Sequence, residues 1–273
     1  MTETFVYDGM KFNYKTIGDG PSMVFCHGLG GDIDQPEELI GPVDTCQLIF
    51  MDSRGHGLTR PGGTADKLNF QTFADDLRAL LDHLDISSAV IGGISMGAGV
   101  AAQFASRWPD RVEGLVLVRP AWLDAPMPPN LELIPYIAEL LADKEPHDAL
   151  GEFLSTRKSE LKAIARVSSA TLKSLCQQFT KTGSIERRLR LKHIPACSPI
   201  ESWSEISDLQ MPVLVVGNDR DPMHPYEFAE EWARNLSQSR LVKIPSKAEN
   251  LNEHKRSFRK HFLEFITSLR QGD

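Results

Sequence analysis

The sequence predicts an α/β fold, with a mostly parallel central sheet flanked by helices and a helical segment inserted into it. Short apolar runs closed by turn residues alternate with amphipathic helical patterns through residues 1–120. Only helical patterns follow over 121–203, and the alternation returns over 204–273. Alternation without a repeat period indicates one sheet of parallel strands covered on both faces. We therefore expect a core formed by 1–120 and 204–273, and a helical insertion over 121–203.

The elements of the first part can be justified in chain order. The segment "TFVYDGMKFNYKTIG" contains Asp8-Gly9, a dipeptide typical of tight hairpin turns between two strands. Apolar residues recur at helical spacing over 70–84, and the small residues over 97–105 predict a helix that can lie close to a sheet. Four short apolar runs indicate buried strands: "SMVFC" (22–26), "CQLIFMD" (46–52), "AVIGGI" (89–94) and "VEGLVLV" (112–118).

The second part begins where this pattern breaks. The break is marked by a group of prolines: Pro120, Pro126, Pro128 and Pro129. After the helical insertion, "MPVLVVG" (211–217) and "RLVKIP" (240–245) again indicate strands. Helices are predicted over 225–236 and 252–270.

Composition and charge argue against several classes of function. The 273 residues carry a net charge of −7, whereas a nucleic-acid-binding protein usually presents a clustered basic face. The locally basic tail "HKRSFRKHFLEF" is expected to be the solvent-facing side of the last helix. No apolar run reaches the ~18 residues of a membrane span. We therefore expect neither a nucleic acid nor a membrane as partner, but a small-molecule substrate.

Terminal residues and cysteines suggest the compartment. The segment "MTETFVYDGM" lacks the basic stretch and apolar run of a secretory signal. The cysteines are scattered without metal-ligand spacing, and two of them lie in apolar runs: Cys26, Cys46, Cys176 and Cys197. We expect a cytoplasmic protein without disulfides, metal or cofactor. The oligomeric state is open.

The strongest chemical motif is Gly93-Ile94-Ser95-Met96-Gly97, a G-x-S-x-G pattern between a predicted strand and a predicted helix. A serine on such a strained turn needs small neighbours two residues away on each side. The N-terminus of the following helix would point at the hydroxyl and stabilise negative charge there. The context predicts Ser95 as a nucleophile rather than a purely structural turn residue.

A second motif, "HGLGG" (27–31), follows the predicted strand 22–26. A loop of this type can direct a backbone N–H at a developing oxyanion. Together with the N–H of Met96, the N–H of Leu29 would form a hole with two donors. The side chain of His27 either lines the substrate pocket or braces the loop by hydrogen bonds.

With these motifs the chain resembles the α/β-hydrolase fold family over nearly its whole length. The resemblance rests on "HGLGG", "FMDSRGHGLTRP", "GISMGAG" and "VVGNDRDPMHP". It implies Ser95 as nucleophile, Leu29 and Met96 as the oxyanion hole, and the insertion as a cap over the pocket. It also implies an acid in the "DPMHP" turn, where Asp221 matches the family pattern better than Asp219.

The chain departs from this family at the histidine that should follow the last strand. In the family this residue precedes a Glu and then a Phe on the final helix. Counting back from Glu253 and Phe258 reaches Ala248, and counting forward from Pro245 reaches Glu249. The third member of a Ser–acid–His triad is therefore missing from its usual place.

Several side chains could replace the missing base, since a neutral serine hydroxyl is a poor nucleophile. His224, three residues beyond Asp221, is the first candidate; its alternative role is to cap a helix or face solvent. His254 and His261 lie on the predicted last helix. Lys247 could act only if burial lowered its pKa. The remaining alternative is that no base exists.

Arg119 is a second unusual feature, because it closes the apolar strand in "VLVRPAW". A buried guanidinium must be paired. It could pair with Asp221, hold an anionic group of the substrate bidentately, or form a salt bridge with Asp124. Trp122 would then form a wall of the substrate pocket.

The sequence leaves three functions open. The leading hypothesis is a serine hydrolase of small esters, amides or related acyl compounds with an atypical or absent histidine base. A rival is a hydrolase-derived ligand-binding protein without catalysis, which the missing histidine and Arg119 favour and the intact serine motif opposes. A third is a lyase or cyclase that uses the same pocket without hydrolysis.

Overall fold

The computed structural model describes residues 2–270, and its core is one eight-stranded sheet with the order β1-β2-β4-β3-β5-β6-β7-β8. The β1–β2 hairpin turns at Asp8 and Gly9, both with positive φ, and β2 pairs antiparallel with β4. From β4 onward every neighbouring pair is parallel. The strands are β1 (Glu3–Tyr7), β2 (Met10–Ile17), β3 (Ser22–Cys26), β4 (Gln47–Met51), β5 (Ala89–Ile94), β6 (Val112–Val118), β7 (Val213–Gly217) and β8 (Ser239–Lys243).

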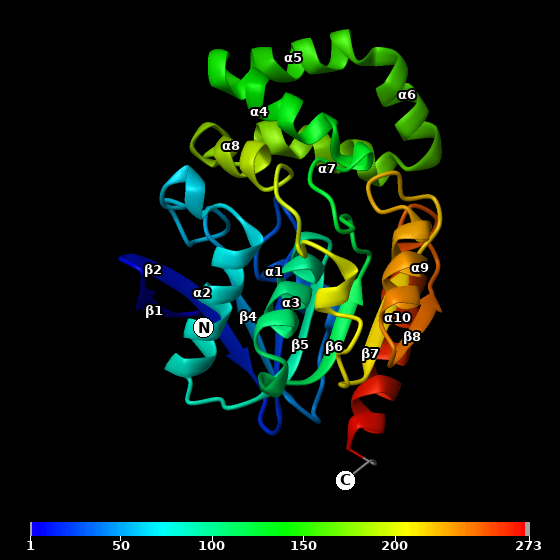
Figure 1. The fold of residues 1–273 in the computed structure, drawn as a ribbon. Coiled ribbons are helices and arrows are strands. Elements are labelled where there is room, and N and C mark those ends of the chain that lie inside the picture. Colours follow the sequence, from blue (N-terminus) through cyan, green and yellow to red (C-terminus); the bar gives the residue numbers. More distant parts are fainter. Residues whose placement is uncertain (1, 271–273) are drawn as a thin grey trace.

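Helices cover both faces of this sheet, as Figure 1 shows. Residues of α2, α3 and α9 pack into one apolar layer, and residues of α1 and α10 pack into the other. Successive strand residues point to opposite faces, so Val24 joins the first layer and Phe25 the second. The helices are α1 (Asp34–Ile40), α2 (Phe70–His83), α3 (Met96–Arg107), α9 (Tyr226–Asn235) and α10 (Leu251–Leu269).

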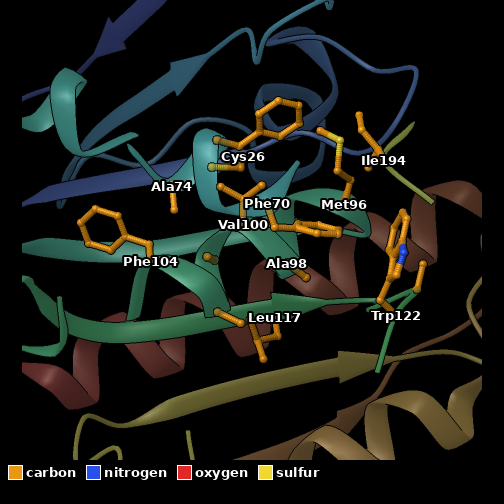
Figure 2. Packing of buried hydrophobic residues seen from close by; sticks show 14 of the residues in the cluster. Cys26, Phe70, Ala74, Met96, Ala98, Val100, Phe104, Leu117, Trp122 and Ile194 are labelled. Atoms are coloured by element: carbon orange, nitrogen blue, oxygen red, sulfur yellow. The ribbon is translucent and has the colours of Figure 1, made fainter. Parts of the chain in front are cut away.

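The larger apolar layer lies around α3, whose residues from Met96 to Ala105 are all buried. Figure 2 shows side chains from β3, α2, α3 and β6 meeting there, with Phe70 and Trp122 in contact. Their rings are 5.3 Å apart, in an edge-to-face arrangement. The small residues of α3 allow this close approach of helix and sheet. The start of α3, and therefore the serine before it, is held by a rigid core.

Five helices follow β6 before the next strand and lie together at one end of the molecule (Figure 1). Among them, α4 contacts α5, α7 and α8. These helices are α4 (Leu133–Asp143), α5 (Pro146–Thr156), α6 (Lys158–Val167), α7 (Ser169–Thr180) and α8 (Ser184–His193). Short 3₁₀ helices occur at η1 (Ala65–Lys67), η2 (Pro109–Arg111), η3 (Pro129–Leu131) and η4 (Trp203–Glu205).

The predicted fold class is confirmed: a mostly parallel sheet flanked by helices. Each predicted strand and helix is present, with ends that differ by a few residues. The short helix α1 was not predicted, because seven residues containing Pro36 give too little helical periodicity to recognise. Over residues 2–270, none of the helices combines the length and apolar character needed to cross a membrane.

Candidate active site

Ser95 lies on a sharp turn between β5 and α3, with the strained backbone angles φ 57° and ψ −111°. The turn depends on its two glycines. A Cβ atom on Gly93 would lie 2.2 Å from the backbone of Gly97, and one on Gly97 would lie 2.3 Å from the carbonyl oxygen of Cys26. Because backbone atoms on both sides leave no room, only glycine fits at either position. The G-x-S-x-G spacing therefore has a steric cause in this fold.

The group that contacts the serine hydroxyl is His224, whose Nε2 lies 2.9 Å from Ser95 Oγ. His224 belongs to the loop between β7 and α9. A tight turn, in which the His224 N–H donates to the Asp221 carbonyl at 3.0 Å, folds this loop back over the end of the sheet. The imidazole is buried. Its distance is the one expected of a base that accepts the hydroxyl proton.

Asp221 lies on the other side of the imidazole. Its Oδ2 is 3.0 Å from His224 Nδ1 and 3.2 Å from a terminal nitrogen of Arg119. The Nδ1 contact is short but oblique, so it is an electrostatic contact rather than a well-directed hydrogen bond. A carboxylate beside Nδ1 favours the tautomer that carries its proton there, which leaves Nε2 as the acceptor for Ser95.

The charge states of Asp221 and His224 allow His224 to act as a base. Burial disfavours the ionised form of Asp221, but His224, Arg119 and Lys247 outweigh it and hold the carboxyl pKa well below its usual range. Burial lowers the pKa of His224; Asp221 opposes this shift, while Arg119 and Lys247 reinforce it. At neutral pH the site therefore holds an aspartate and a neutral imidazole, which can accept a proton.

Two backbone N–H groups lie next to Ser95 or in the lining of its cavity. The N–H of Met96 is at the start of α3, where helix geometry leaves it without a partner in the helix. The N–H of Leu29 follows that of Gly28, which donates to the Gln35 side chain at 2.6 Å. Within residues 2–270, neither the Leu29 nor the Met96 N–H donates a hydrogen bond. This arrangement is suited to binding an oxyanion.

Ser95 and His224 line a small cavity of about 50 Å³. Its floor comes from the ends of the strands and its roof from α4 and α7. Apolar walls are provided by Leu29, Ile94, Trp122, Leu131, Ile134, Leu175 and Met223; polar or charged groups come from Gln35, Arg119, Thr171, Ser174, Gln178, Asp221 and Lys247. Apolar walls combined with several polar and charged groups can hold and orient a small polar molecule.

The remaining candidates from the sequence lie elsewhere or act differently. His27 does not line this cavity: its Nε2 accepts from Ser53 N–H at 3.0 Å and its Nδ1 contacts the Gly28 carbonyl, which corrects the pocket assignment in favour of bracing. His254 contacts the Pro245 carbonyl through Nδ1 at 2.8 Å.

Two further candidates are occupied at the surface. His261 lies beside Glu264, and Asp219 pairs with Lys243 at 2.7 Å, so neither faces Ser95. Arg119 pairs with Asp221, one of the three alternatives considered for it. In the part of the chain that the structure describes, no three His, Cys, Asp or Glu side chains are grouped to hold a metal ion.

The polar roof of the cavity was missed by sequence reasoning. Thr171, Ser174 and Gln178 lie on one face of α7, at spacings of three and four residues. This pattern is also that of any helix with a partly polar side. Only the packing of α7 over the end of the sheet shows that these residues face the cavity.

Known proteins resemble this chain in sequence. The model of the alpha/beta hydrolase fold matches residues 21–253. The non-heme chloroperoxidase CPO-A1 of Kitasatospora aureofaciens is 34% identical over 155 residues, which cover 56% of this chain and 50% of that protein. The bifunctional esterase/perhydrolase DCH of Acinetobacter calcoaceticus is 25% identical over 288 residues, which cover 96% of this chain and 98% of that protein. Two other curated relatives are matched over only 30% and 42% of their lengths.

Solved structures share the architecture. The enol-lactonase of Burkholderia xenovorans LB400 superimposes with a TM-score of 0.74 at 21% identity, and the match covers 97% of this chain and 100% of that one. At this identity the likeness concerns the fold. The family match extends over most of the chain and includes the serine turn, the glycine-rich loop and the aspartate loop. The chain therefore belongs to the alpha/beta hydrolase fold family.

Proposed function

We propose that the protein is a serine hydrolase that acts on small esters, amides or related acyl compounds. Ser95 is the nucleophile, His224 the base and Asp221 the acid. The observation that carries this proposal is the 2.9 Å contact between Ser95 Oγ and His224 Nε2, because a serine needs a base within hydrogen-bond distance. The names of two relatives, an esterase/perhydrolase and an enol-lactonase, agree with acyl chemistry.

In the proposed reaction, His224 accepts the Ser95 proton while Oγ attacks the substrate carbonyl. The oxyanion of the tetrahedral intermediate accepts hydrogen bonds from the N–H groups of Leu29 and Met96. The imidazolium, stabilised by Asp221, then donates its proton to the leaving group, and an acyl-enzyme forms. Water attacks the acyl-enzyme with His224 again as base, which releases the acid and restores the serine.

This assignment places the base on the same loop as the acid. The position after β8 where a histidine is expected, Ala248 or Glu249, holds none, and His224 reaches the serine from the loop after β7. We also propose that helices α4–α8 act as a cap, because residues of α4 and α7 roof the cavity. For the compartment we propose the cytoplasm, in agreement with the four free cysteines.

The proposal is tested by labelling with a fluorophosphonate probe, which reacts only with an activated serine. Wild-type protein should be labelled, and Ser95→Ala should not. His224→Ala should slow labelling by about 10³-fold or more, the usual loss when a triad member is removed. His261→Ala is the matched control: His261 contacts Glu264 away from Ser95, so this substitution should leave the labelling rate unchanged.

Two outcomes would contradict the proposal. If a folded wild-type sample is not labelled, the rival hypotheses of a ligand-binding protein or a non-hydrolytic enzyme take its place. If His224→Ala is labelled as fast as wild type, the hydrolase has another base, and Lys247, which lines the same cavity, is the next candidate.

A further inference from the structure

We propose that Arg119 and Lys247 form an anion subsite beside Ser95, and that the preferred substrate is an ester or lactone that also carries a carboxylate. This inference rests on the proposed function and deepens it by naming the substrate class. Both side chains line the cavity that contains Ser95 and His224. They reach it from different strands, since Arg119 follows β6 and Lys247 follows β8.

Arg119 is held in this position by its backbone. Its φ of 48° lies in the left-handed region, which is costly for a residue with a side chain. Its N–H donates to the Val216 carbonyl of β7 at 2.7 Å, which ties the strained residue to the end of the sheet. The side chain is 7% exposed. A charged residue kept in a strained and buried conformation at the edge of a cavity is consistent with a role in binding.

The guanidinium is only partly paired. It has one contact with a carboxylate, at 3.2 Å from Asp221 Oδ2, and its buried Nε donates to no group within residues 2–270. The same Oδ2 also faces His224, so one oxygen serves two partners. A planar guanidinium can present two parallel donors to a carboxylate. Arg119 therefore retains donor capacity for a ligand.

Lys247 adds a second positive charge. The positive charge of Arg119, together with burial, lowers the pKa of Lys247 to about 8. Within residues 2–270 it forms no salt bridge with a carboxylate, although exposed lysines of this chain such as Lys243 do. Its proximity to Arg119 is unfavourable without an anion between or beside the two groups. A bound carboxylate would remove this repulsion.

The charges around the subsite indicate the charge of the anion that it would bind. Arg119 and Lys247 contribute two positive charges, and Asp221 contributes one negative charge. His224 and the nearby His254 are neutral at pH 7, because burial lowers the pKa of both. The surplus is one positive charge, which matches a carboxylate. A phosphate monoester would bring a charge of about −1.5 to −2 and leave the site negative.

The experiment compares matched pairs of esters that differ only in a terminal carboxylate. Monoethyl succinate, glutarate and adipate are paired with ethyl butanoate, pentanoate and hexanoate, and kcat/KM is measured for each. At least one half-ester should exceed its neutral partner by about tenfold or more, the effect of a hydrogen-bonded charge pair. Lys247→Met should reduce this ratio by about tenfold, whereas Lys260→Met, which removes an exposed charge outside the cavity, should leave it unchanged.

A binding arm separates this inference from the proposed function. Glutarate should slow fluorophosphonate labelling of Ser95 in wild-type protein and do so less in Lys247→Met, while inorganic phosphate should protect more weakly. Labelling without glutarate protection and without a preference for half-esters would overturn the subsite and leave the hydrolase intact. If nothing is labelled, calorimetric titration of glutarate into wild type and Lys247→Met decides: equal or absent binding overturns the subsite.

Discussion

The substitution Gly97→Ala tests whether steric contact between α3 and β3 holds the serine turn in place. The new Cβ atom would lie 2.3 Å from the Cys26 carbonyl oxygen, 2.6 Å from its carbon and 2.8 Å from the His27 carbonyl oxygen. Favourable contacts between such atoms occur at about 3.5–4.0 Å. The start of α3 must therefore move by about 1 Å, because all three atoms belong to the backbone.

Two magnitudes follow from this displacement. Overfilling a well-packed interior costs about 1–3 kcal/mol, and the upper end applies where α3 is buried from Met96 to Ala105. For a chain of this size about 3 kcal/mol lowers the Tm by roughly 6–12 °C. A shift of about 1 Å at Ser95 should also slow the reaction with fluorophosphonate about 10²-fold.

The assay is thermal and urea unfolding followed by circular dichroism, together with the rate of Ser95 labelling. Gly151→Ala is the control, since Gly151 lies inside α5 with no heavy atom within 4 Å of the added Cβ. That substitution should stabilise the protein by about 0.5–1 kcal/mol through helix propensity alone. If Gly97→Ala unfolds within about 0.5 kcal/mol of wild type and is labelled at the same rate, the steric account of the turn is wrong.

Three further predictions concern pH and buried residues. The rate of Ser95 labelling should rise with pH to a plateau, with a midpoint below the ~6.5 of an ordinary histidine. The reason is that burial lowers the pKa of His224 and only its neutral imidazole accepts a proton. A midpoint above that value would contradict the assignment of His224 as the base. Asp76→Ala should destabilise the fold by about 3 kcal/mol in urea unfolding, since it removes the buried partner of Arg54 at 2.6 Å and leaves that guanidinium only the more exposed Asp8 at 2.9 Å. A loss under about 1 kcal/mol would argue against this. Phe70→Ala should cost about 3–5 kcal/mol by the same measurement, because the fully buried ring packs on the core, and near-wild-type stability would show that the cavity collapses.

Much of the fold could be predicted from the sequence because its signals are local. A buried strand such as 112–118 is a short apolar run, and the structure places β6 over the same residues. The serine turn is also recognisable locally, since the two glycines and the serine lie within five residues. The clash that requires Gly93 is with Gly97 inside the turn, whereas the clash that requires Gly97 is with Cys26 at the end of β3. Helix α1 shows the limit, because a seven-residue helix has too few turns to show a period.

The site itself required the tertiary structure. Sequence reasoning produced four candidate bases and could not choose among them, since Ser95 and His224 are 129 residues apart and meet only when the loop after β7 folds over the sheet. The pairing of Arg119 with Asp221 spans 102 residues in the same way. The sequence alone determined the fold class and the serine turn, because short-range periodicity and sterics specify them. Only the tertiary structure decided which imidazole meets the serine and which cations face the cavity, because those contacts depend on where distant loops meet at the edge of the sheet.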